Sequence, residues 1–315
     1  MRHLAIGVLT CLAASGTAGA QTWQPPSDSQ RCPSKWGAAD ERGAGNLKGP
    51  ESVLRAAKLI RTGEVIELGQ VLSAAMPLNP TRQFDIHTKR TTMNPQSNRR
   101  GSNEELIVAE FGQVGTQFDG FAHQTIGDSM YNCFKVGDVG TRTGFTKLGI
   151  QNVGAIVTRG VLIDVTALKG VDMVPDTYEI TVEDLRQALS KQRVALQQGD
   201  AVLIHTGWGR LWGKDNARYQ ATNPGIGVAS SEWLARQSPI LVGADTAPVE
   251  VSPNPDRELS LPGHQIMLVV NGIHLLENLK LDELAAKRVY EFAFIVEPLK
   301  IQGATGSTVA PIAIR

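Results

Sequence analysis

Short runs of β-branched and aliphatic residues recur along this chain, and polar residues follow almost every run. Residues 161–165, 200–204 and 240–243 are such runs. Side chains of this kind pack well on a pleated surface, so each run predicts a buried strand. Segments with helical spacing lie between the runs. The pattern therefore predicts an α/β fold, a single domain with a strand-rich mixed sheet and flanking helices.

Local signals place the individual elements. Thr181 followed by Asp184 resembles a capping box and predicts a helix to about residue 192. Ser230 or Ser231 is expected to cap the helix around Trp233. Further helices are expected after Pro50 and at 282–287, and strands at 65–71, 155–165 (two strands or one bent strand), 200–204, 240–243, 289–296 and 310–314. The apolar run 266–270 repeats the strand pattern, and residues 79–103, rich in Thr, Asn, Arg and Pro, predict a long loop or lid.

The charge balance excludes several classes of partner. The 315 residues include 31 basic and 31 acidic side chains, so the formal net charge is zero. Neither nucleic acid nor an anionic membrane is expected as a partner, because both require a basic surface. A small-molecule substrate is expected instead.

The N-terminus predicts export. Arg2 and His3 precede an apolar run, and Ala18-Gly19-Ala20 is a small-residue cleavage pattern, so residues 1–20 are expected to be a signal peptide, with a buried first helix as the alternative. The mature domain would then span 21–315 in the periplasm or outside the cell. Its cysteines, Cys32 and Cys133, could form a disulfide there or remain as two buried thiols.

The run from Gln113 to His123 concentrates residues that could form a site. If the backbone is extended, as the preceding residues 106–108 suggest, positions 113, 115, 117 and 119 share one face. Two amides and the Asp119 carboxylate would then point the same way. Glycines at 115 and 120 allow tight turns that could bring His123 to that face. This arrangement predicts a metal site or an acid–base site.

More distant residues could complete a metal site. Carboxylate, imidazole and amide donors are the groups that hold divalent ions. The candidates are Gln113, Gln117, Asp119, His123, His264 and Glu277. His205 could line the pocket or hold its own loop, whereas His87 and His274 are interpreted as structural. The chain has no Gly-x-Ser-x-Gly elbow, dinucleotide fingerprint or Walker motif, which argues against a serine hydrolase and a nucleotide cofactor.

The chain resembles the metal-dependent cyclase family of hydrolases, which includes bacterial kynurenine formamidase and isatin hydrolase. The family motif His-x-Gly-Thr-His-x-Asp-x-Pro-x-His is matched by residues 113–123 with Gln113 and Gln117 in place of imidazoles and Phe121 in place of proline. Further matches are 36–47, 159–164, 205–208, 243–246, and His264 with 277–279.

The resemblance implies a swivelling β/β/α cyclase-like fold and a homo-oligomer. It also implies that Asp119, His264 and Glu277, with Gln113 and Gln117 at the first two ligand positions, bind one or two divalent ions, Mn or Zn. His123 would transfer the proton. An amide oxygen is a harder donor than imidazole, so more room for manganese is expected.

The resemblance further implies hydrolysis of an amide, lactam or lactone bond in a small cyclic or aromatic substrate by a metal-activated water. Phe118, Phe121 and Trp208, with His205, are expected to line the substrate pocket, although ordinary core packing would also explain the three aromatic residues. The alternative function is a catalytically inactive periplasmic binding protein on the same fold.

Overall fold

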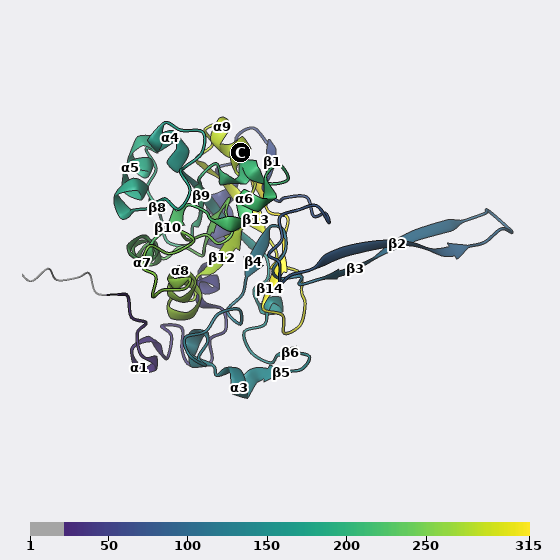
Figure 1. Ribbon diagram of the computed structural model, residues 1–315, viewed down its shortest axis with the longest axis horizontal. Helices are drawn as coiled ribbons and strands as arrows, with labels where there is room; N and C mark the ends of the chain where they lie inside the picture. The colour runs from purple at the N-terminus through teal and green to yellow at the C-terminus, as the bar shows by residue number, and fades with distance from the viewer. Residues whose placement is uncertain (1–21) are drawn as a thin grey trace, which may run out of the picture.

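The computed structural model describes residues 22–315 (Figure 1). The expected signal peptide at 1–20 lies outside the described residues. A nine-stranded sheet organises the domain, in the order β1-β15-β13-β7-β9-β11-β12-β4-β14. Strands β7, β9, β11 and β12 run parallel, and the pairs on either side of them are antiparallel. The expected α/β fold with a mixed sheet is confirmed.

The strands have short bounds, and several small ribbons accompany the main sheet. The strands are β1 Val65–Glu67, β2 Phe84–Met93, β3 Gly101–Ala109, β4 Gln117–Asp119, β5 Gly140–Thr141, β6 Gly144–Phe145, β7 Ile156–Asp164, β8 Glu179–Ile180, β9 Ala201–His205, β10 Gly225–Ile226, β11 Leu241–Ala244, β12 His274–Glu277, β13 Glu291–Val296, β14 Gly306–Thr308 and β15 Ile312–Ile314. Residues 155–165 thus form one strand rather than two, and the strand predicted at 65–71 ends at Glu67.

Helices pack beside the sheet and connect its strands. The α-helices are α1 Asp28–Arg31, α2 Pro50–Ala57, α3 Val136–Val139, α4 Val165–Lys169, α5 Val182–Gln192, α6 Asn216–Ala221, α7 Val228–Arg236, α8 Pro262–His264 and α9 Asp282–Ala286, with a π-helix at Gln265–Val270 and 3-10 turns at Gly43–Leu47, Tyr131–Cys133, Ile150–Asn152 and Trp208–Leu211. Within residues 22–315, no helix has both the length and the apolar character needed to cross a membrane.

Both faces of the sheet are buried, because each packs against a hydrophobic core. Side chains alternate along each strand, so neighbouring residues enter different cores. In β7, Val161 and Ile163 pack into one core with α5 and α7, whereas Leu162 packs into a second core with β13. The capping box predicted for α5 is present, since the Thr181 side chain accepts a hydrogen bond from the backbone N–H of Asp184. Figure 1 shows α4, α5 and α7 on the same side of the sheet.

A disulfide joins the N-terminal segment to the turn before α3. Cys32 is bonded to Cys133, with their Cα atoms 6.0 Å apart. Of the two alternatives left open by the sequence, the structure contains the disulfide. It closes a long loop, and a crosslink of that kind stabilises a fold chiefly by restricting the unfolded chain.

The loop or lid expected at 79–103 is largely a β-hairpin. Strands β2 and β3 pair antiparallel from Phe84 opposite Ala109 to Met93 opposite Gly101. The hairpin projects away from the body as a long arm (Figure 1), and most of its side chains are exposed. The prediction was wrong because the strands are ordered by pairing with each other, and no apolar periodicity marks a ribbon that is exposed on both faces.

Two helical segments also differ from their predictions. Residues 266–270 are helical rather than extended, since a short apolar run has the same pattern in a buried helix as in a buried strand. Helix α7 begins at Val228 after Gly227, so neither predicted serine caps it. Ser230 and Ser231 instead donate hydrogen bonds to the carbonyl oxygens of Ile180 and Gly227.

Candidate metal centre

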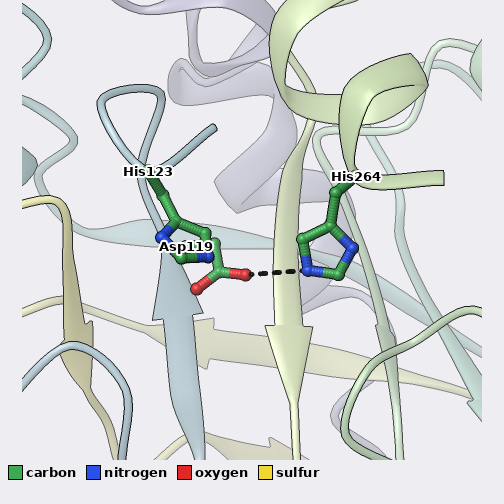
Figure 2. Close-up of side chains that lie close together, drawn as sticks. All are labelled: Asp119, His123 and His264. Atoms are coloured by element: carbon green, nitrogen blue, oxygen red, sulfur yellow. Dashed lines mark ion pairs between the residues drawn. The ribbon is translucent and has the colours of Figure 1, made fainter. Parts of the chain in front are cut away.

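Three elements distant in sequence bring the candidate donors together. Strand β4 carries Gln117 and Asp119, and it pairs antiparallel with β12, where Glu277 lies opposite Gln117. His264 comes from α8, and His123 from the turn that follows β4. Figure 2 shows the Asp119 carboxylate facing the His264 ring, with His123 beside it. The sheet register therefore sets the spacing of the carboxylates, and α8 adds the imidazole.

The run 113–123 is not one extended strand, which corrects the expectation of a shared face. Only Gln117–Asp119 is strand, and Gly115 has a φ of 65°, a left-handed conformation that favours glycine. Gln113 reaches the site from a turn. Its amide Nε2 lies 3.3 Å from Asp119 Oδ1 and 3.3 Å from His123 Nδ1. The turn at Gly115 thus brings the Gln113 side chain to the site, where the predicted extended strand would also have placed it.

His264 connects the two carboxylates. Its Nε2 lies 3.1 Å from Glu277 Oε1 and 3.6 Å from Asp119 Oδ2. The amide of Gln117 donates to Glu277 Oε2 over 2.8 Å. Asp119, His123 and His264 can each offer one donor atom such that all three atoms lie within 4.8 Å of one another. All six predicted donors therefore lie in one site.

Three buried oxygens at this site have no hydrogen-bond donor. They are Gln113 Oε1, Asp119 Oδ2 and Glu277 Oε1; His264 Nε2 lies 3.1 Å from Glu277 Oε1, but its N–H is not directed at that oxygen. A buried acceptor without a donor is costly, and most buried polar atoms in proteins have a partner. Oxygens of two carboxylates and an amide, together with an imidazole nitrogen, match the donor preferences of a divalent cation. The residues present therefore fit a metal ion.

Glu250 holds the imidazole of His264, and it was not among the residues predicted from the sequence. Its Oε1 lies 2.6 Å from His264 Nδ1 and accepts the backbone N–H of His264, while Oε2 accepts the N–H of Gly263. A carboxylate on the far ring nitrogen fixes the tautomer and orientation of a metal-binding histidine. One signal was visible in the sequence, because Glu250 is a single acid between two valines in a segment bounded by prolines.

Asn278 ties the glycine turn to Glu277. Its Nδ2 donates to the carbonyl of Gly115, and the hydroxyl of Thr116 donates to the carbonyl of Asn278. Tyr219 donates its hydroxyl to Asn278 Oδ1. These buried contacts bring the two halves of the site to a fixed separation.

The titration behaviour reflects an excess of buried negative charge. Burial alone would raise the pKa of Asp119, but nearby His123 and His264 lower it below its ordinary value. Burial and the neighbouring Asp119 raise the pKa of Glu277. His264 is also fully buried, yet Asp119, Glu250 and Glu277 raise its pKa well above the ordinary value. Three carboxylates around one imidazole favour a bound cation.

A cavity of about 500 Å³ opens in front of these donors. Gln113, Gln117, His123, His264 and Glu277 contribute to its lining. The residues expected to form its wall lie elsewhere: Phe118, Phe121, His205 and Trp208 are buried and are not part of the lining. The pocket role predicted for the three aromatic residues is therefore wrong, and the alternative, ordinary packing, holds: Phe118 and Phe121 belong to the two cores, and Trp208 is buried. Phe121, for example, stacks on His274 with ring centroids 4.1 Å apart.

His205 holds its own loop, which was the second of its two predicted roles. Its Nδ1 lies 3.0 Å from Asp164 Oδ1, and its Nε2 lies 3.7 Å from Asp282 Oδ1 and 3.9 Å from Asp245 Oδ2. Burial opposes its charge, but these carboxylates raise the pKa of His205 to about 10. The carboxylates around His205 therefore favour its charged form and hold the loop that carries it.

The other two histidines are outside the donor set. His274 is buried, its Nδ1 lies 3.0 Å from the carbonyl oxygen of Asp119, and burial lowers its pKa to about 4. That contact supports the backbone of β4, in agreement with the structural role predicted for it. His87 is exposed on the hairpin arm.

The fold and site define a metal-binding α/β domain, and comparison with known proteins identifies its family. A profile of the family described as "Putative cyclase" matches residues 66–251. A crystal structure described as a novel cyclase is 32% identical, covers 89% of this chain and 98% of its own, and superposes with a TM-score of 0.80. The chain belongs to the cyclase family.

More distant structures share the fold. Isatin hydrolase A from Ralstonia solanacearum is 22% identical with a TM-score of 0.57, over 80% of this chain and 92% of its own. An isatin hydrolase bound to the product analogue thioisatinate is 23% identical with a TM-score of 0.59, over 84% and 98%. No curated protein matches the chain.

Proposed function

We propose that this protein is a metal-dependent hydrolase that opens or cleaves an amide, lactam or lactone bond of a small cyclic substrate. One observation carries the proposal: three buried oxygens without a hydrogen-bond donor, from Gln113, Asp119 and Glu277, converge with His264 at the end of a cavity. The family and the isatin hydrolases of the same fold support hydrolysis of a cyclic substrate.

The residues have distinct roles in the proposed reaction. Asp119, His264 and Glu277 would hold the divalent ion, with Gln113 and Gln117 as the amide donors. A metal in such a site lowers the pKa of bound water from ~15.7 towards ~7 and polarises a carbonyl group. His123 accepts a proton from the attacking water and returns it to the leaving nitrogen or oxygen.

The amides of Gln113 and Gln124 flank the ring of His123. Its Nδ1 lies 3.3 Å from the amide nitrogen of Gln113, and its Nε2 lies 3.2 Å from that of Gln124. Glu250 in turn fixes His264. The proton-transfer residue and the imidazole ligand are thus both positioned by neighbours before the substrate enters, which reduces the reorganisation needed in the reaction.

The amide donors bear on the choice of metal. In this chain Gln113 and Gln117 replace two imidazoles of the family motif, and carboxamide oxygen suits Mn better than it suits Zn. We therefore expect manganese to compete well with zinc, with one or two ions per subunit. Elemental analysis of the purified protein, repeated after reconstitution with each ion, measures both identity and stoichiometry.

A screen decides between the hydrolase and the inactive binding protein. The reconstituted protein is offered formamides, cyclic imides and lactones, and product formation is followed. Turnover that requires the metal supports the hydrolase. If the protein holds no metal, binds these compounds and never turns them over, it is instead a periplasmic binding protein. The replacement of two imidazoles by glutamines is the feature that favours this alternative.

Export and self-association complete the proposal. A disulfide is typical of an oxidising compartment, so Cys32–Cys133 supports a periplasmic or secreted protein. An isolated two-stranded ribbon is marginal in water, and Ile86, Leu106 and Val108 are exposed on the arm, which supports a homo-oligomer. The mature N-terminus and the mass in solution test these two points.

A further inference from the structure

The cavity in front of the metal centre is lined by polar and aliphatic groups. Its polar lining includes Asn79, Gln124, Gln220, Asn254 and Ser260, and its aliphatic lining includes Leu78. Among the described residues, no Phe, Tyr or Trp lines it. An aromatic substrate is usually held by aromatic stacking, which these walls do not provide. A compact, non-aromatic ring is a better match.

One cationic side chain, Arg82, faces this cavity. Within residues 22–315 it is the only Lys or Arg among the lining residues, and no carboxylate lies within 4.0 Å of it. Arg82 is half-buried, and its Nη1 donates to the carbonyl of Gln113 over 2.9 Å. In the described part of the chain, its other guanidinium N–H groups have no acceptor.

Arg82 lies where it could bind an anionic group of a substrate next to the acidic donors. The carboxylates of Asp119, Glu250 and Glu277 lie at the donor end of the cavity, so Arg82 is the place in the lining at which an anionic group of a substrate would bind. The bond to Gln113 provides that place, because Gln113 itself contacts Asp119 and His123. A guanidinium with free N–H groups pairs with a carboxylate through two parallel hydrogen bonds.

We propose that the substrate is a small, non-aromatic cyclic amide or lactone that carries a carboxylate, and that Arg82 binds this carboxylate. The proposal rests on the proposed hydrolase function and names its substrate class. The ring carbonyl then lies towards the metal centre, and Arg82 determines specificity without taking part in the bond cleavage. Water adds across the ring C–N or C–O bond, which gives an open-chain amino or hydroxy acid with two carboxylates.

Matched substrates separate this role from a structural one. The probes are γ-butyrolactone and its 5-carboxylate, and the lactams 2-pyrrolidinone and pyroglutamate, each offered to the reconstituted wild type, Arg82→Gln and Arg82→Lys. Arg100→Gln, in the exposed arm, is the matched control. A charge-assisted hydrogen bond corresponds to roughly a 10- to 100-fold effect, so kcat/KM for the carboxylated probe that turns over should fall by that factor in Arg82→Gln.

The decisive result is whether the loss of kcat/KM lies in KM or in kcat, and whether it affects both probes of a pair or only the carboxylated one. We expect the loss to appear mainly in KM, to be partly restored by Arg82→Lys, and to be absent for the uncharged partner of the pair. Equal loss for both members would show that Arg82 only supports the Gln113 backbone. A preference for isatin or phthalimide over every carboxylated probe would also overturn the proposal.

Measurements of ligand binding distinguish failure of the hydrolase proposal from failure of the Arg82 anion site. If no probe turns over in the metal-loaded wild type, the hydrolase assignment fails for these substrates, and calorimetry then measures 2-hydroxyglutarate against 4-hydroxybutyrate. Tighter binding of the dicarboxylate that is lost in Arg82→Gln supports the anion site independently of catalysis. The anion site is refuted if the wild type binds the two acids equally well, or if Arg82→Gln binds the dicarboxylate as tightly as the wild type does.

Discussion

At the residue scale, Asp119 makes two kinds of contact at once. Its Oδ1 lies 3.3 Å from the amide nitrogen of Gln113, whereas its Oδ2 has no donor and faces His264 Nε2 at 3.6 Å. The carboxylate is fully buried, and the neighbouring imidazoles lower its pKa despite that burial. One oxygen is therefore fixed by the protein and the other is left for a cation.

Replacing Asp119 should remove the metal. We expect Asp119→Ala to retain no ion after dialysis and to be inactive, because a charged donor at the centre of the set is lost. Elemental analysis gives the stoichiometry, and circular dichroism verifies the fold. Asp172→Ala, which changes a carboxylate that is 96% exposed, should retain the wild-type metal content. A full complement of metal in Asp119→Ala would contradict the assignment of the site.

Replacing His123 should separate binding from turnover. We expect His123→Ala to keep its metal and to lose a factor of ~10² to 10⁴ in kcat, the usual contribution of general acid–base catalysis. His123 also lies within 4.8 Å of the Asp119 and His264 donors, so metal content must be measured alongside the kinetics. Loss of the ion would make His123 a ligand, and a fully active variant would exclude both roles.

Glu250 is a positioning residue, and its variant should act through His264. We expect Glu250→Gln to weaken metal affinity by ~10- to 100-fold, the range seen when the partner of a metal-binding histidine is changed. Titration against a chelating dye measures the affinity. Glu258→Gln, an exposed acid a few residues away, is the control. Unchanged affinity in Glu250→Gln would show that the backbone of α8 alone orients the ring.

At the scale of elements, the site depends on strand pairing and on one short helix. Glu277 lies opposite Gln117 because β12 and β4 pair in that register, and a slip of β12 by one residue would turn Glu277 to the other face of the sheet. The arm formed by β2 and β3 is different, since its side chains beyond the root are exposed and neither strand packs substantially on another element. The arm should therefore contribute little to the stability of the body.

Shortening the arm tests this separation. A variant that joins Ile86 to Ile107 through Asn-Gly, in place of residues 87–106, keeps a pair of opposed residues and adds a favourable two-residue turn. We expect its Tm to remain within about 2 °C of the wild type, because exposed side chains make small contributions. Light scattering on the same sample tests the homo-oligomer, whose mass should fall if the arm forms its interface. A large fall in Tm with unchanged mass would show that the arm supports its own body.

At the scale of the whole molecule, the candidate metal centre joins distant parts of the chain. Its predicted donors extend from Gln113 to Glu277, and Glu250 and Asn278 tie the same segments together. The unfolded chain has no such preformed site, so bound metal stabilises the native state by mass action.

Removal of the metal should therefore lower the thermal stability. At a free metal concentration 100 times Kd, the stabilisation is ~2.7 kcal/mol, and a chelator should remove it. Calorimetric scans with and without EDTA measure the shift in Tm. Asp119→Ala should show no such shift. A chelator effect of equal size in that variant would point to a second site elsewhere.

Some features of this protein follow from local patterns alone. Strands β7, β9 and β11 of the parallel centre, helix α5 with its capping box, and the residue types of the donor set were predicted from sequence, because alternation, capping and donor chemistry are encoded within a few residues. Strand β12 was not predicted. The distant residues His264 and Glu277 were candidates because of their donor chemistry, and the family resemblance implied that they bind the metal. The role of His274 was also correct, since an apolar neighbourhood disfavours a charged imidazole.

Other features were decided by the tertiary structure. The arm depends on cross-strand pairing, the placement of Phe118, Phe121 and Trp208 depends on which core gap each ring fills, and Glu250 acts only because its segment lies against α8. Arg82 became a candidate only when the cavity wall was known. The sequence by itself determined which chemical groups are available, and long-range packing decided which of them meet, because contacts between residues far apart in the chain leave no periodic signal.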